Sequence, residues 1–344
     1  MAAFADAIIA WQRRHGRHDL PWQNTTDAYA IWVSEIMLQQ TQVTAVIGYY
    51  AKFMQRFPSI TALASASQEE VLQSWSGLGY YSRARNLHNA AQKIRDEFSG
   101  VFPTQFDAIL SLPGIGKSTA AAISTFALHA PQPILDGNVK RVFARHFNIA
   151  GWPSAPAIEK KMWQIAQREN PSALNQNARA IAYTQGLMDL GATLCTRSKP
   201  KCAACPVNAS CEALAKKLVH TLPTPKPRQV IPEKNTTMLI FINGDEVMLE
   251  KRPPVGIWGG LWSFPEVNND DIHLQNASPL TKLTHTFTHF KLHIQPQLVH
   301  TSKKSQANEP HTIWLNLDDA IGAAIPTPVR KILQELHRAN KKSA

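Results

Sequence analysis

Glu35 is a carboxyl group in a place where it could act as an acid. It lies in the run AYAIWVSEIML, which is apolar on nearly every side of a predicted helix. Burial there would remove water from the carboxyl group and raise its pKa. The group would then stay protonated near neutral pH and serve as a proton donor. A salt-bridged structural glutamate is the alternative interpretation.

Asp136 is a second carboxyl group of interest, in the string ILDGNVKRV. Asp-Gly before a helix is typical of an N-cap, and capping is the simplest interpretation. Amide donors also hold a capping carboxylate ionised and in place, as a site that stabilises a developing cation requires. Lys140, one turn later, is expected to pair with Asp136 or to contact a phosphate.

All four cysteines occur in one short segment, Cys195-x6-Cys202-x2-Cys205-x5-Cys211. Four thiolates this close in sequence could bind one metal centre. A chain of this size does not depend on disulfides for stability. Zinc sites usually contain two evenly spaced pairs, so the uneven spacing favours an iron–sulfur cluster, with a structural zinc as the alternative.

A glycine-rich hairpin is expected between two helices at Leu112-Pro113-Gly114-Ile115-Gly116-Lys117. Glycines permit a sharp turn and expose amide groups beside a helix N-terminus, which suits a phosphate. The string therefore predicts a helix-hairpin-helix that binds a DNA backbone without reading its sequence. A plain interhelical turn is the alternative.

Other residues have the chemistry to contact a distorted duplex. Gln39, Gln40 and Thr41 interrupt two apolar stretches, and Tyr80 lies on a glycine loop. Polar and aromatic wedges can fill the gap that a flipped base leaves, although either motif alone is often an ordinary loop. Basic residues between the first two cysteines extend the expected DNA surface: Arg197, Lys199 and Lys201.

Composition agrees with a polyanionic partner. The 344 residues carry a net charge of +11 with a pI near 9.6, which favours nucleic acid but is weak evidence alone. No apolar run is long enough to span a membrane, and Asp6 stands where a signal peptide needs positive charge. We expect a cytoplasmic monomer with no membrane partner.

The elements divide the chain into three parts. An all-α domain is expected over 1–217, a proline-rich linker over 218–234 and an α+β domain over 235–344. In the last part, Asn243-Gly244-Asp245 predicts a hairpin turn, β-like runs follow at 282–299 and 311–317, and Thr327 opens a helix. Helices of the first part are predicted at 28–38, 43–57, after the capping box at 67–70, and at 82–98, 104–111, 117–129, 138–147, 156–169 and 175–192.

In this order, the strings SEIMLQQTQV, WSGLGYYSRARNLH, LPGIGKSTA and ILDGNVKRV and the cysteine loop resemble the endonuclease III superfamily of DNA glycosylases. The closest pattern is that of the MutY-type adenine glycosylases. The resemblance implies that Glu35 protonates the departing adenine and that Asp136 stabilises the cationic sugar. It also implies one [4Fe-4S] cluster in the loop 195–211 and duplex DNA, with adenine opposite 8-oxoguanine or guanine, as the partner.

Further roles also follow from the resemblance. Gln40 and Tyr80 match residues that fill the helix around the lesion. In superfamily members that also cut the backbone, a lysine stands where this chain has Ser118, so water is the expected nucleophile. The implied adenine pocket consists of Trp22, Ser118, Asn138 and Gln185.

The string GIWGGLWSFP in the C-terminal part resembles a strand of Nudix domains, but the acidic metal-binding helix of a working hydrolase is absent from the sequence. This implies an 8-oxoguanine reader at Phe287, Thr288 and His289, where the family has Phe-Ser-His. Strict strand alternation would separate Thr288 from its two neighbours. If all three side chains touch the base, the segment must be a bend or a tip.

Overall fold

The computed structural model describes residues 4–171, 177–227, 230–267, 276–301 and 311–343. Contacts divide the chain into two compact units. The first comprises residues 1–64 and 89–228, and the second comprises residues 65–88 and 229–344. The predicted boundaries at 217 and 234 stay predictions.

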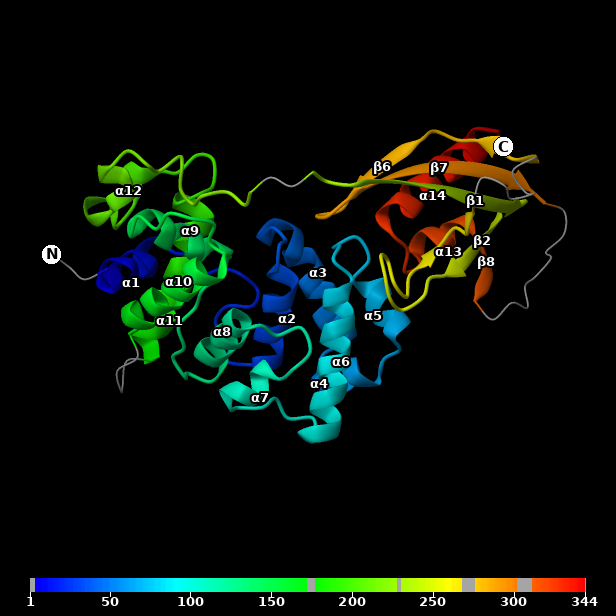
Figure 1. The fold of residues 1–344 in the computed structure, drawn as a ribbon. Coiled ribbons are helices and arrows are strands. Elements are labelled where there is room, and N and C mark those ends of the chain that lie inside the picture. The colour runs from blue at the N-terminus through cyan, green and yellow to red at the C-terminus, as the bar shows by residue number, and fades with distance from the viewer. Residues whose placement is uncertain (1–3, 172–176, 228–229, 268–275, 302–310, 344) are drawn as a thin grey trace. The chain divides into compact units, whose positions relative to one another are not determined.

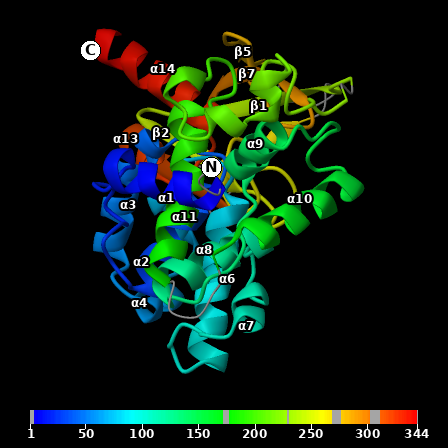
Figure 2. The same ribbon diagram turned by 90° about the vertical axis from the view of Figure 1, so that its left-hand side faces the viewer.

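The first unit is helical, as expected from the sequence (Figure 1). Helix α1 packs along α11, and both contribute to an apolar core with α9 and α10 (Figures 1 and 2). Its helices are α1 (Phe4–His15), α2 (Ala28–Leu38), α3 (Val43–Arg56), α4 (Ile60–Ser65), the end of α6 (Ser82–Glu97), α7 (Phe106–Leu110), α8 (Lys117–Ala127), α9 (Gly137–His146), α10 (Pro156–Glu169), α11 (Asn177–Asp189) and α12 (Glu212–Ala215).

Helix α2 forms the centre of this unit because its residues are apolar almost all round. Asp27 caps it by accepting a hydrogen bond from the Tyr29 amide at 2.9 Å. Trp32, Val33 and Met37 are fully buried, so the helix is surrounded by protein. A polar side chain on α2 is thereby held in an apolar environment.

Several helix ends differ from the sequence expectation. Helix α7 spans only Phe106–Leu110 because Ser111 already begins the glycine hairpin. Helix α11 ends at Asp189 and continues as a π-helical turn over Leu190–Leu194. The predicted start of that helix, at 175, falls outside the described residues. The helix α4 was not predicted.

The second unit contains a mixed sheet, and its α+β class agrees with the prediction. The central strands β1 and β7 run parallel over ten residue pairs, from Glu233 with Lys291 to Ile242 with His300. The strands are β1 (Glu233–Asn243), β2 (Glu246–Lys251), β3 (Trp262–Ser263), β4 (Glu266–Val267), β5 (Ser278–Pro279), β6 (Leu283–Thr286), β7 (Lys291–His300) and β8 (Thr312–Asn316).

The start of α6 belongs to this unit, as do α5 (Gln68–Ser74), α13 (Leu317–Gly322) and α14 (Thr327–Ser343). The capping box predicted at the start of α5 is present, with Ser67 and Glu70 bonded reciprocally. Helix α14 starts at Thr327 as expected and buries Val329, Ile332 and Leu333. Strand β3 lies within GIWGGLWSFP, the string that resembles a Nudix strand, whereas the short strands β4 and β5 and α13 were not predicted because segments this short have no readable period.

Strands β1 and β2 form the predicted hairpin, with Asn243 opposite Glu246. The β-like run at 282–299 is two strands, because residues 287–290 turn back between β6 and β7. Strand β1 begins at Glu233, so the predicted linker overlaps it by two residues. Within the described ranges, no helix is both long and apolar enough to cross a membrane.

Candidate active site

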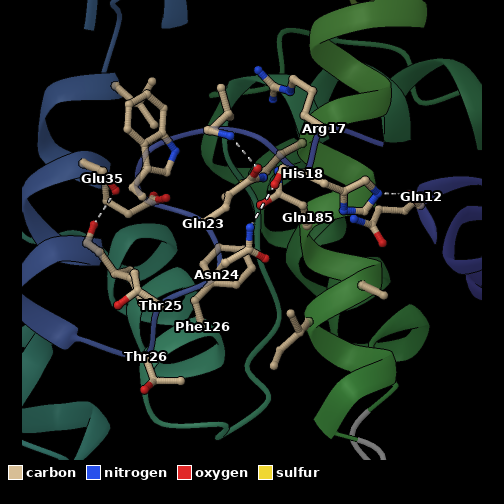
Figure 3. Close-up of a pocket in the computed structure, with 18 of the residues that line it drawn as sticks. Gln12, Arg17, His18, Gln23, Asn24, Thr25, Thr26, Glu35, Phe126 and Gln185 are labelled. Atoms are coloured by element: carbon tan, nitrogen blue, oxygen red, sulfur yellow. Dashed lines mark hydrogen bonds between the residues drawn. The ribbon is translucent and has the colours of Figure 1, made fainter. Parts of the chain in front are cut away.

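A cavity of about 460 Å³ opens in the first unit beside α2 (Figure 3). This volume is ordinary for a small-molecule site. Figure 3 shows Glu35 on one wall and Gln185, from α11, across the cavity. Its lining comes from α1, the loop before α2, α2, α3, α8 and α11, and includes Gln12, Trp22, Ser34, Glu35, Phe126 and Gln185.

The pKa of Glu35 is strongly shifted by the surroundings of its carboxyl group. Burial raises the pKa of Glu35 from 4.5 to about 8, and the negative charge of Asp136 adds to the shift. The carboxyl group is therefore mostly protonated at neutral pH and faces a cavity. It can give a proton to a bound molecule.

Asp136 is the N-cap of α9, as the Asp-Gly pattern predicts. Its Oδ1 accepts a hydrogen bond of 2.7 Å from the Val139 amide. Burial raises the pKa of Asp136, whereas the amides of Val139 and Asn138 and the charges of Arg141 and Lys140 oppose that rise. From the sequence, amide donors were expected to keep Asp136 ionised, and the effect of burial on its pKa was not predicted.

Gln185 is held by a buried carboxylate that the sequence analysis missed. Its Nε2 donates to Asp189 Oδ1 at 2.9 Å, and Arg17 reaches the same carboxylate with its amide and guanidinium nitrogens at 2.7–2.9 Å. Asp189 is fully buried. The reasoning that identified Glu35, a carboxyl group in an apolar run, applies equally to GLMDLGA and could have found it.

Of the four expected adenine-pocket residues, Trp22 and Gln185 line the cavity. Ser118 and Asn138 do not. The Ser118 hydroxyl accepts from the Leu135 amide at 3.3 Å, and Asn138 Oδ1 accepts from Arg141 at 2.7 Å. Both side chains therefore form hydrogen bonds near Asp136, and their role in an adenine pocket stays a prediction.

Arg141 joins that segment to the cysteine loop. Its guanidinium donates to Asn138 Oδ1, to the Gly191 carbonyl and to the Cys195 carbonyl, each at 2.7 Å. Gly191 has to be small here, because an added Cβ would lie 2.5 Å from Asn138 Cβ. The start of α9 and the first cysteine are thus fixed to each other.

The four cysteines line one small hollow together with Arg145, whose Nη1 lies 3.4 Å from Cys195 Sγ. None of these four cysteines is in a disulfide. Within the described part of the chain, no three histidine, cysteine or acidic side chains are already grouped as ligands of one metal ion. Four thiols around one hollow are nevertheless the donor set of a thiolate-bound centre.

The glycine hairpin joins α7 to α8 as predicted, with Gly114 at φ +79° and Gly116 as the N-cap of α8. Gly114, Gly116 and Lys117 are exposed, and the Lys117 ammonium lies 4.2 Å from the Trp163 ring centroid. Leu112 is only 2% exposed, so it packs in the interior rather than on the surface of the hairpin. The hairpin presents amide groups at a helix N-terminus.

Two expected wedge residues have strained backbones. Gln40, after α2, is exposed at φ +56°, and Tyr80, in the second unit, is 46% exposed at φ +50°. Non-glycine residues rarely adopt such angles, which cluster at functional sites. Beside Gln40, Gln39 donates to Thr119, and the Thr41 hydroxyl donates to the Gln39 carbonyl.

The predicted basic contacts differ in their surroundings. Arg197 and Lys199 are exposed on the cysteine loop. Lys140 forms a 2.6 Å ion pair with Glu159, on α10, rather than with Asp136. This ion pair competes with a phosphate for the ammonium group of Lys140.

The segment 287–290, in the second unit, is a tip between β6 and β7, as the expected reading role required. The Phe287 amide donates to the Phe290 carbonyl at 2.9 Å and closes a tight turn. Thr288 and His289 are exposed at this turn, and Phe287 is half-buried. Thr288 and His289 are therefore accessible to a partner, and a contact of Phe287 with the same partner stays a prediction.

Comparisons with known proteins agree with this architecture. Residues 33–168 match the HhH-GPD superfamily of base excision DNA repair proteins, and residues 237–335 match the NUDIX domain. Among solved structures, a thermostable thymine-DNA glycosylase is similar at 29% identity with a TM-score of 0.55, covering 62% of this chain and 95% of that one. An endonuclease III–DNA complex shares the fold at 19% identity, with a TM-score of 0.51 and coverage of 62% and 94%.

Sequence relatives cover almost the whole chain. The adenine DNA glycosylase of Buchnera aphidicola subsp. Acyrthosiphon pisum is 38% identical over 97% of this chain and 98% of its own length. The human adenine DNA glycosylase is 31% identical over 97% of this chain and 74% of its own. The chain therefore belongs to the adenine DNA glycosylase family, enzymes of base excision repair that hydrolyse N-glycosidic bonds.

Proposed function

We propose that this protein removes adenine paired with 8-oxoguanine or guanine in duplex DNA and leaves an abasic site. The observation that carries the proposal is Glu35, a carboxyl group with a pKa of about 8 in the wall of a base-sized cavity. A flipped adenine would enter that cavity. We further propose that the protein acts as a cytoplasmic monomer.

Glu35 supplies the acid for this reaction. Its proton goes to a ring nitrogen of adenine, so the electrons of the breaking glycosidic bond are taken up by a neutral leaving base. Gln185 then helps to hold the base: with its Nε2 donated to Asp189, the carbonyl Oε1 is left to accept from an exocyclic amine. Adenine carries such an amine at C6.

Asp136 stabilises the positively charged sugar that remains. The Val139 amide holds its carboxylate at the N-terminus of α9, so little reorganisation is needed when positive charge develops on the sugar. Two carboxyl groups with different roles at one sugar are typical of glycoside hydrolysis. Water adds to the sugar and completes the reaction.

Ser118 supports water, rather than an amine, as the nucleophile. It occupies the position of the lysine that forms a Schiff base in backbone-cutting relatives, and its hydroxyl is bonded to the Leu135 amide. The neighbouring Lys117 ammonium is at the Trp163 ring. Neither residue lines the Glu35 cavity.

The cysteine loop is proposed to hold one [4Fe-4S] cluster through Cys195, Cys202, Cys205 and Cys211, which share one hollow. The cluster supplies four metal–thiolate bonds that order the loop, and no hydrolytic chemistry. Through Arg141, an ordered loop also steadies the start of α9.

Three residues of the second unit are proposed to read 8-oxoguanine: Phe287, Thr288 and His289. The glycine hairpin is proposed to contact DNA, together with Gln40, Tyr80, Arg197 and Lys199.

Borohydride trapping on a duplex with adenine opposite 8-oxoguanine tests this mechanism. We expect free adenine, strands that break only after alkali treatment, and no covalent protein–DNA adduct. An endonuclease III-type lyase run in parallel serves as the positive control. An efficient adduct formed by this protein would contradict hydrolysis by water.

A further inference from the structure

Trp258 stands out in the second unit because its backbone is strained. It has φ +57°, a left-handed angle that is unfavourable for a large aromatic residue, and its side chain is only 8% exposed. Strain of this kind persists only where the surroundings hold the residue firmly. The residues that hold Trp258 in this conformation therefore indicate the role of its ring.

The loop that carries Trp258 is tightly closed. The Arg252 amide donates to the Leu261 carbonyl at 2.9 Å, and the Leu261 amide donates to the Trp258 carbonyl at 3.0 Å. A Cβ on Gly259 would lie 2.5 Å from the Pro254 carbonyl oxygen, so the two sides of the loop are in direct contact. The loop has little room to move and fixes the direction of the tryptophan ring.

Arg252 braces the ring from one side. Its guanidinium carbon lies 5.9 Å from the Trp258 ring centroid, within the range of a cation–π interaction. The guanidinium is itself held by an ion pair with Glu266 and by a hydrogen bond of 3.2 Å to the Ile257 carbonyl.

On another side, Trp258 contacts the tip formed by residues 287–290. Its ring centroid lies 5.5 Å from that of Phe287 and 5.6 Å from that of His285. Phe287 is in turn stacked on Phe290 at 4.5 Å with an interplanar angle of 21°. Phe287 is thus held between Phe290, His285 and Trp258.

From these contacts we infer that Trp258 is a positioning residue for 8-oxoguanine recognition, with its ring fixing Phe287 and therefore the exposed Thr288 and His289. This inference rests on the proposed reading role of the tip. Trp258 is too buried to make the base contact itself. An aromatic pair contributes about 0.5–1.5 kcal/mol beyond area burial, which corresponds to about two- to tenfold in a rate ratio.

The test compares base release from adenine opposite 8-oxoguanine with base release from adenine opposite guanine. Trp258→Gly removes the ring and suits the left-handed backbone, so loss of the ring is separated from added strain. We expect the preference for 8-oxoguanine to fall about two- to tenfold while release opposite guanine is nearly unchanged. Trp258→Phe, which keeps an aromatic ring, should recover most of the preference.

Trp314→Leu on β8 is the matched control, because it removes a ring from the same sheet and should retain the preference. If Trp258→Gly does not fold, Arg252→Met decides, since loss of the cation should lower the preference about two- to fivefold. An unchanged preference in a folded Trp258→Gly or in Arg252→Met would overturn the inference. Absence of any preference in the unaltered protein would instead refute the proposed reading of 8-oxoguanine by the tip, and absence of adenine release from both duplexes would refute the proposed function.

Discussion

At the residue scale, chemistry depends on two carboxyl groups whose surroundings differ. Burial and the negative charge of Asp136 raise the pKa of Glu35 to about 8. Asp136 has amide donors and two cations that oppose the effect of burial on its pKa. The same side-chain chemistry can therefore provide an acid at one position and a charge-stabilising group at the other.

The pH dependence of base release tests the role of Glu35. The protonated form is needed, so the rate should be highest below pH 8 and fall as pH rises through about 8, approaching tenfold per unit above it. Single-turnover rates from pH 6 to 10, with circular dichroism to confirm folding, measure this. A rate that rises through the same range would contradict the assignment.

Glu35→Gln is the matched variant for that experiment. It should lower base release by about 10²–10⁴-fold while duplex binding persists.

The stability of the folded protein should also depend on Glu35. Because the folded pKa lies above the unfolded value of 4.5, Glu35 contributes stability at low pH that is lost as pH rises through 8. The glutamine variant should lack this loss of stability.

At the element scale, the start of α9 combines capping with chemistry. Asp136 begins the helix, Asn138 faces Gly191 through its Cβ, and Arg141 extends the connection to Cys195. Structural and catalytic roles therefore overlap at one helix N-terminus. A pair of substitutions at Asp136 can separate them.

Asp136→Asn keeps a side-chain oxygen that can accept from the Val139 amide but removes the charge. We expect its melting temperature to match or exceed that of the unaltered protein, because a buried charge is lost, whereas base release is nearly abolished. Asp136→Ala should also be inactive and less stable than Asp136→Asn by about 1 kcal/mol. If Asp136→Asn retained full activity, the residue would be a cap alone.

The sequence predicted elements well where local signals are strong. Asp-Gly, the capping box at Ser67 and the glycine hairpin each specify a local conformation, and each appears in the structure. Side-chain contacts between segments far apart in the sequence could not be predicted from such local signals. The pairing of Arg17 with Asp189, 172 residues apart, is one case, and the hydrogen bond between the Ser118 hydroxyl and the Leu135 amide is another.

At the scale of the whole molecule, the two units carry different parts of the proposed task. The first contains the Glu35 cavity, the glycine hairpin and the cysteine loop, and the second contains Tyr80 and the tip at Phe287. Excision requires the first, whereas discrimination between bases opposite adenine is expected to require the second. A net charge of +11 favours encounter with any duplex, so specificity must come from these sites.

The most direct test of the central claim is the single-turnover rate of adenine release from three duplexes that differ only in the base opposite adenine. We predict that release opposite 8-oxoguanine and guanine exceeds release opposite thymine by at least about tenfold, or ~1.4 kcal/mol in activation free energy. Equal rates on the adenine–thymine duplex, or no release from any of the three, would contradict the account.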